Sequence, residues 1–132
     1  MDTNSYPDPT AFDSLVDLLD DIAIRYPADR PILRLRTDEG PGLAWSAAEL
    51  RTRARLAAWR LRALGLQRGD RLLTWSPSTP ALPAVYWGAM MAGVIFVPLD
   101  ARMAPAVMVR IAERSGAEVL AIGGEDAAPD PV

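Results

Sequence analysis

The sequence predicts an α/β domain in which a parallel βαβαβ sheet with helices on both faces follows a helix and a small antiparallel hairpin. Strand-like runs alternate with helical segments of about ten to fifteen residues across 71–122, as is typical of βαβ units. These strand-like runs are almost entirely apolar, which is expected when helices cover both faces of a sheet. Before them, apolar and basic residues alternate on one side of a turn-rich loop, which predicts the hairpin.

The N-terminal residues predict a flexible arm followed by one amphipathic helix. Residues 1–11 are polar and contain Pro7 and Pro9, so they favour an arm without regular structure. Thr10 is predicted to cap the helix, and Pro27 to end it. The apolar residues of this segment recur at helical spacing and form one stripe, made of Phe12, Leu15, Val16, Leu19, Ile22, Ala23 and Tyr26.

A hairpin and a long helix are predicted next. The runs 31–36 and 42–46 flank a turn-rich loop and predict its two strands. Ser46 and Glu49 have the spacing of a capping box, so a helix should begin there. Gly65 suits a left-handed residue at the end of that helix. The predicted buried stripe of the helix consists of Leu50, Ala54, Ala57, Leu61 and Leu64.

The segment 72–99 contains no charged residue, and its length raises the question of a membrane span. Prolines at its start and Gly93 within it predict a helix over 79–92 that ends in a left-handed cap. The β-branched and aromatic run 94–97 then predicts a short buried strand closed by Pro98. A buried helix and strand are therefore favoured over a span.

The rest of the sheet is predicted from the same alternation. A strand is expected over 71–75, a helix over 104–115 and a last strand over 118–122. Residues 123–132 begin with two glycines and are acidic and rich in Ala and Pro, so they predict a linker-like tail. Residues 12–122 therefore form one predicted domain.

Composition excludes several kinds of chemistry. The chain has 132 residues, half of them hydrophobic, which excludes a disordered sequence. It contains no cysteine, histidine or lysine, so it offers no disulfide, thiol nucleophile, imidazole base, Schiff-base lysine or familiar zinc site. The net charge of −3 gives no basic surface for nucleic acid. The first residues lack the pattern of a signal peptide, which favours the cytoplasm.

No residue of the sequence receives a catalytic, cofactor-binding or metal-binding role. Neither a G-x-x-x-x-G-K-[ST] loop nor a G-x-G-x-x-G turn is present. Residues 76–79 come between a strand and a helix, where parallel sheets often bind ligands, but a plain capped turn is the favoured interpretation. A solvated acidic face is favoured over a metal site for the aspartates of the first helix, which are Asp13, Asp17, Asp20 and Asp21.

Four stretches resemble the N-terminal part of the acyl-adenylate-forming, AMP-dependent ligases, and they occur in that family's order over 12–122. "IAIRYPADRPIL" resembles the family's opening helix, Tyr-Pro stop and strand. "WSAAELRTRARLAAWRLRALGLQRGDRLL" resembles its T-Y-x-E-L motif and the helix that ends G-L-x-x-G-D-R-V, although Ala47 stands at the aromatic position. "SPSTPALPAVYWGAMMAGVIFVPLD" resembles the helix before A-G-x-x-x-V-P-[LI]-[DN], and "RIAERSGAEVLAI" the next helix and strand. Within the family, the fatty-acid–CoA ligase branch is the most similar.

The resemblance implies an activity for a full-length family member. Such enzymes convert a carboxylate and MgATP to an acyl-adenylate and pyrophosphate, and then transfer the acyl group to CoA or a carrier thiol. ATP, Mg²⁺ and CoA are thus implied, whereas the family's phosphate loop and catalytic lysine have no counterpart in this sequence. The isolated chain is therefore predicted to be inactive. Its expected partner is the remainder of a ligase polypeptide or a second copy in a homodimer, with 79–92 near that contact. A free-standing, non-catalytic α/β binding or assembly module is the alternative.

Overall fold

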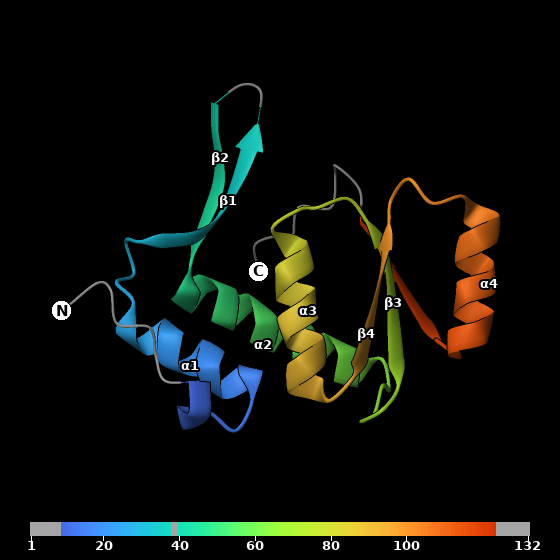
Figure 1. The fold of residues 1–132 in the computed structure, drawn as a ribbon, viewed down its shortest axis with the longest axis horizontal. Helices are drawn as coiled ribbons and strands as arrows, with labels where there is room; N and C mark the ends of the chain where they lie inside the picture. The colour runs from blue at the N-terminus through green and yellow to red at the C-terminus, as the bar shows by residue number, and fades with distance from the viewer. Residues whose placement is uncertain (1–8, 38–39, 124–132) are drawn as a thin grey trace.

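The computed structural model describes residues 9–37 and 40–123, and its helices and strands follow the predicted order (Figure 1). The predicted arm over 1–8 and the tail from 124 onward lie outside the described residues. The N-terminal elements are a short 3-10 helix η1 (Pro9–Ala11), α1 (Leu15–Arg25), β1 (Pro31–Thr37), β2 (Gly40–Ser46) and α2 (Ala47–Ala63). The C-terminal elements are β3 (Arg71–Ser76), α3 (Ala81–Ala92), β4 (Ile95–Asp100), α4 (Pro105–Ser115) and β5 (Val119–Ile122).

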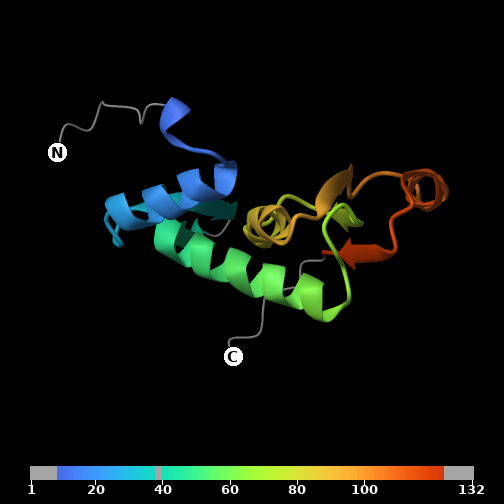
Figure 2. The same ribbon diagram turned by 90° about the horizontal axis from the view of Figure 1, so that it is seen from below.

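The predicted fold class is confirmed by the sheet topology. Strands β1 and β2 form an antiparallel hairpin, whereas β4, β3 and β5 form a parallel sheet in that order. The chain leaves β3 toward one edge of the sheet and then crosses to the other edge. Because crossover connections are right-handed, this reversal places α3 and α4 on opposite faces. Figure 2 shows α3 on one side of the sheet and α4 on the other.

Helix α2 connects the two parts of the hydrophobic core. One cluster lies between α2, α3 and the sheet and consists of Ala58, Leu61, Leu66, Leu72, Ala89, Ala92 and Val94. The other lies between α1, α2, α3 and the hairpin and consists of Leu19, Trp45, Leu50, Ala54 and Ala84. Both clusters take residues from α2 and from α3, so the packing of these two helices joins the parallel sheet to the N-terminal elements.

The ends of α2 form as its sequence predicts. Ser46 Oγ accepts a hydrogen bond from Glu49 N at 3.3 Å, and Ser46 N donates to Glu49 Oε2 at 2.7 Å. At the other end, Gly65 has a φ of 91° and its N–H donates to Arg62 O. Leu66 N donates to Leu61 O, which completes a Schellman motif. The capping box and the left-handed glycine are therefore confirmed.

The predicted buried stripe of α2 is wrong at one position. Leu64 is 66% exposed, because it is the C-terminal cap and lies beyond the contact with α3. Ala57 is half-buried, whereas Ala47 and Ala58 complete the buried face. The buried face of α2 therefore includes Ala58 in place of the predicted Ala57, and it begins one turn earlier, at Ala47.

The start of α1 also differs from the prediction. The cap is Ser14, whose Oγ accepts from Asp17 N, whereas Thr10 lies in η1 and Phe12 precedes the helix. Leu19 is the one fully buried residue of α1, and Leu15 is 50% exposed. Val16, Ile22 and Ala23 are half-buried, whereas Leu15 and Tyr26 at the two ends of α1 are exposed.

The apolar segment divides into a helix and a strand, as predicted. The strand is not buried, because it lies at an edge of the sheet: Ile95 is 47% exposed and no residue of it is fully buried. Helix α3 begins at Ala81 rather than at residue 79, and Gly93 ends it with a φ of 74°. Strand β4 continues through Pro98 to Asp100, so Pro98 does not close the strand. Pro98 pairs with Thr74 on an edge strand, where a residue without an N–H is tolerated. Within the described residues, no helix has the length and apolar character that a membrane span needs.

The capping box gives a stability prediction. Ser46→Ala removes the acceptor for Glu49 N at a buried helix start, and we expect the free energy of unfolding to fall by about 0.5–2 kcal/mol in chemical denaturation. Thr52→Ala is the matched control, because the Thr52 hydroxyl donates to Ala48 O in the exposed interior of the same helix. That control should change stability by less than about 0.5 kcal/mol. Equal effects of the two substitutions would contradict the role of the cap.

The crossing of α2 and α3 gives a second prediction. A Cβ on Gly88 would lie 2.6 Å from Ala57 Cβ, 2.8 Å from Ala54 O and 2.9 Å from Ala58 N. Gly88→Ala should therefore destabilise the fold by about 1–3 kcal/mol, although alanine normally favours a helix over glycine. The double variant Ala57→Gly/Gly88→Ala should recover only part of this loss, since two of the close atoms are backbone. A thermal melt in which Gly88→Ala is as stable as the wild type would refute this packing.

Candidate functional site

The strand order predicts where this sheet can hold a ligand. Ligands of open parallel sheets bind outside the carboxyl ends of the strands, where successive connections run in opposite directions. In the order β4-β3-β5 that point lies between β3 and β5. Ser76 ends β3, and Gly123 follows β5 at the same edge. The structure therefore brings the predicted 76–79 segment and the first tail residue together.

Ser76 and Gly123 are in direct contact at this edge. Gly123 N donates to Trp75 O at 3.2 Å and so continues the pairing of β5 with β3. A Cβ on Gly123 would overlap the Ser76 side chain, which explains why glycine is needed here. Ser76 Oγ donates to Pro77 O at 2.9 Å. No sequence pattern predicted this approach, because the two residues are far apart in the chain.

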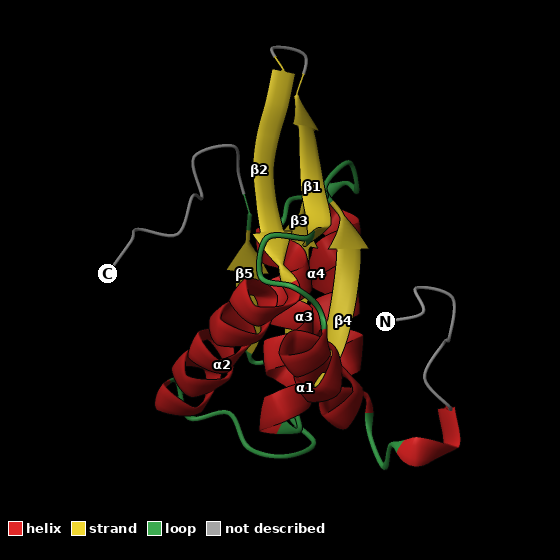
Figure 3. Ribbon diagram, turned by 90° about the vertical axis from the view of Figure 1, so that its left-hand side faces the viewer, coloured by secondary structure: helices red, strands yellow, loops and turns green. Residues whose placement is uncertain are grey.

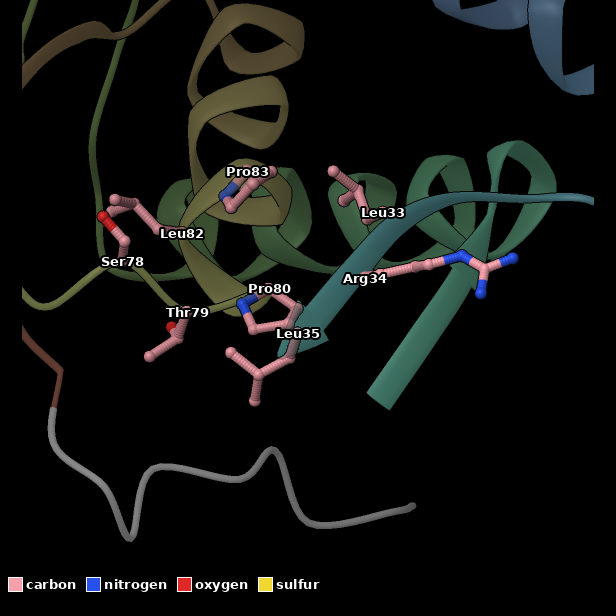
Figure 4. Close-up of a pocket in the computed structure, with 8 residues that line it drawn as sticks. All are labelled: Leu33, Arg34, Leu35, Ser78, Thr79, Pro80, Leu82 and Pro83. Atoms are coloured by element: carbon pink, nitrogen blue, oxygen red, sulfur yellow. The ribbon is translucent and has the colours of Figure 1, made fainter. Parts of the chain in front are cut away.

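A cavity of about 260 Å³ opens where the 78–83 segment meets β1 (Figure 4). Its walls are mainly leucine and proline side chains, with Ser78 and Thr79 as polar neighbours. Arg34 also lines it, but Figure 4 shows the Arg34 side chain extending away from Ser78 and Thr79. The cavity is thus an apolar cleft between the hairpin and the start of α3, and it lacks a converging set of charges.

The start of α3 is a poor anion site. Helix N-termini bind anions through free backbone N–H groups. Here Pro80 is the cap and makes no side-chain capping bond, Leu82 N donates to Thr79 O, and Pro83 has no N–H. Residues 77–79 connect β3 to α3 as predicted, but the predicted cap is wrong, because Pro80 is the cap residue and no side chain caps the helix. The few remaining donors make phosphate binding by this turn alone unfavourable.

Asp100 and Arg102 form a charged pair at the end of β4, which the sequence analysis did not single out. Arg102 Nη2 lies 2.7 Å from Asp100 Oδ2, and Asp100 Oδ1 accepts from Arg102 N and Nε at 2.8 and 3.1 Å. The side-chain hydrogen bonds from Arg102 lower the pKa of the Asp100 carboxyl from 3.8 to about 2. Both side chains are largely exposed. The pair stabilises the turn after β4. Because its pKa is low, the Asp100 carboxylate is a weak proton acceptor at neutral pH.

The aspartates of α1 are engaged in local contacts. Asp17 Oδ2 accepts from Ser14 Oγ, and Asp21 pairs with Arg25 at 2.7 Å. Asp20 lies 3.6 and 3.7 Å from two arginines of α2. In the part of the chain that the structure describes, no group of three or more His, Cys, Asp or Glu residues is placed to hold a metal ion.

Comparison with known proteins gives one consistent family. Residues 19–131 match the family described as AMP-binding enzyme. The long-chain-fatty-acid–CoA ligase of Yersinia pestis is 31% identical over 115 residues, which cover 87% of this chain and 20% of that protein. The chain thus spans about a fifth of the length of such relatives. The L-proline–[L-prolyl-carrier protein] ligase of Pseudomonas fluorescens is 38% identical over 76 residues, covering 58% of this chain and 14% of that protein.

Solved structures agree with this family. The N-terminal domain of FACL13 from Mycobacterium tuberculosis superposes with a TM-score of 0.72 at 25% identity, covering 86% of this chain and 27% of that one. A benzoate CoA ligase from Burkholderia xenovorans is 30% identical with a TM-score of 0.68, covering 80% of this chain and 20% of that one. Both similarities extend over most of the described fold.

The Asp100–Arg102 pair gives a prediction about pH. In a carboxyl NMR titration, Asp100 should titrate near pH 2, well below the ordinary value of 3.8. Because the folded pKa is depressed, the pair stabilises the turn above pH 3.8, and this stabilisation is lost as the pH falls from 3.8 toward 2. Arg102→Ala should raise the midpoint, though not fully, since the backbone N–H of residue 102 remains. The control Arg114→Ala should leave it unchanged, and an Asp100 midpoint near 3.8 in the wild type would contradict the pairing.

Proposed function

Because the chain belongs to the family of AMP-binding enzymes, we propose that it acts as the N-terminal subdomain of an ATP-dependent ligase that activates a fatty carboxylate. In this reaction a carboxylate attacks the α-phosphate of ATP, which gives an acyl-adenylate and releases pyrophosphate. A thiol of CoA or of a carrier protein then takes the acyl group and releases AMP. The family match over residues 19–131, together with the similarity to long-chain-fatty-acid–CoA ligases, carries this proposal.

The contribution of this chain to that reaction is structural. Stabilising the charge of a transferring or attacked phosphate requires cations and aligned donors. The sequence contains no lysine, and the start of α3 has few free N–H groups. The carboxyl ends of β3 and β5, joined by the Gly123 N–H to Trp75 O hydrogen bond, instead give a fixed surface against which further segments can pack. ATP, Mg²⁺ and CoA would accordingly be held mainly by other parts of a full-length ligase.

The exposed apolar side chains of the sheet support a covering partner. Ile122 is 67% exposed, Ile95 is 47% exposed and Leu120 is 37% exposed, and all three lie on edge strands. The rest of a ligase polypeptide would cover them, or else a second copy of this chain in a homodimer. Residues 79–92 suit this contact less well than the sequence suggested, since every side chain of α3 is buried or half-buried. We place the complete enzyme in the cytoplasm.

Pyrophosphate exchange tests whether the chain acts alone. The purified 132-residue chain, supplied with MgATP and a series of saturated fatty acids, should give no exchange above the blank. The Yersinia pestis ligase assayed in parallel is the positive control. Reproducible exchange by this chain would show that adenylation needs none of the missing segments, and would overturn its assignment as a subdomain.

A chimera then distinguishes a ligase subdomain from a free-standing binding module. Residues 12–122 replace the matching segment of the Yersinia pestis ligase, and the chimera is assayed for acyl-CoA formation. We expect measurable activity, because the two segments are 31% identical over 115 residues. The same chimera carrying Gly88→Ala should lose activity through instability. A folded but inactive chimera would favour the free-standing module.

A further inference from the structure

Helices α1 and α2 lie side by side and border a shallow groove on the surface of the molecule (Figure 2). The groove has a volume of about 330 Å³. Val16 and Asp20 line it from α1, and Arg55, Trp59 and Arg62 line it from α2. Trp59 is 65% exposed, so this side of the groove is open to solvent.

The two sides of this groove carry opposite charges. Carboxylates spaced by four and three residues form an acidic row along α1 and the residue before its cap, made of Asp13, Asp17 and Asp20. Two arginines two turns apart form a basic row on α2, made of Arg55 and Arg62. Asp20 lies 3.7 Å from Arg55 and is the member of the acidic row that pairs with the basic row within the described chain. Asp13 and Asp17 are exposed, and Arg62 has no carboxylate of a described residue within 4 Å, so both rows keep charge for a partner.

The acidic and basic rows make this face complementary to itself. Asp20 is level with Arg55, because the two are paired. Val16, one turn earlier in α1, lines the groove together with Arg62, two turns later in α2. The start of α1 therefore lies beside the end of α2. A two-fold axis along the groove would set each acidic row on the basic row of a second copy at the same level, and every contact would then occur twice.

We propose that this α1–α2 face binds a second copy of the chain in a two-fold dimer. Asp17 of each copy lies against Arg62 of the other, and Asp20 of each against Arg55 of the other. Trp59 of each copy covers the groove of the other and supplies the apolar part of the contact. A partner of one charge sign is disfavoured, because one of the two rows would repel it. The contact is separate from the exposed edge strands of the sheet, and the inference is independent of the proposed ligase function.

Self-association of the 132-residue chain tests the proposal. Sedimentation velocity is measured at protein concentrations from about 1 µM to about 200 µM, which covers the range of weak dimers. We expect a reversible dimer at low ionic strength. Its dissociation constant should rise at least about tenfold in about 0.5 M salt, because salt screens exposed charge pairs. A chain that stays monomeric at low ionic strength, or a dimer whose dissociation constant does not change with salt, would overturn the proposal.

Charge reversal tests the pairing of the two rows. Arg55→Glu/Arg62→Glu makes both sides of the groove acidic, and Asp13→Lys/Asp17→Lys makes both sides mainly basic. Each variant alone should dimerise at least about 30-fold more weakly, because like charges then face each other and every contact occurs twice. An equal mixture of the two variants should associate again, since the acidic face of one meets the basic face of the other. If the double arginine variant fails to fold by circular dichroism, Arg62→Glu alone should still weaken the dimer about fivefold.

Two control variants locate the contact. Arg110→Glu/Arg114→Glu makes the same change of net charge at exposed sites on α4 and should weaken the dimer less than about threefold. Ile122→Glu places a charge on the exposed edge strand β5 and should have an equally small effect. A dimer that survives the charge reversals, folded variants that fail to associate when mixed, or a dimer abolished by Ile122→Glu would refute the α1–α2 contact.

Discussion

The close approach of α3 to α2 at Gly88 is the contact on which the rest of the fold depends. Gly88 lies directly against the backbone of α2, so a single added methyl group meets Ala54 O and Ala58 N. Helix α3 is also the crossover between β3 and β4, and α2 contributes to both hydrophobic clusters. The contact between α2 and α3 therefore positions the parallel sheet relative to α1 and the hairpin. Few other contacts join these N-terminal elements to the sheet.

This crossing also determines what the carboxyl edge of the sheet offers. It directs the start of α3 toward β1, where Pro80 and Pro83 supply shape but few donors. Beside it, Ser76 and Gly123 meet at the carboxyl ends of β3 and β5, strands that Figure 3 shows behind the helices. Apart from the Asp100–Arg102 pair at the end of β4, this edge thus presents mainly apolar surface and backbone. A platform of this kind suits a subdomain that orients neighbouring segments of a larger ligase.

Two surfaces of the chain remain apolar without being part of its core, and their chemistry differs. The edge strands expose Ile95 and Ile122, and these belong to a sheet that further protein can extend or cover. Helix α2 instead exposes Trp59 and carries five arginines. Charge separates the two surfaces, since a protein interior excludes unpaired guanidinium groups.

The sequence by itself determined the features that depend on neighbours within a turn or two. The capping box at Ser46, the left-handed Gly65 and Gly93, and the switch from helix to strand near Val94 follow from local hydrogen bonding and sterics. It also located the connection between β3 and α3 at the carboxyl end of a strand, although not its lack of a side-chain cap. Only the tertiary structure decided that β4 runs on through Pro98, that Leu64 is exposed and that Gly123 meets Ser76. Each of these depends on residues distant in the chain, because strand ends, burial and close approach are set by what packs alongside.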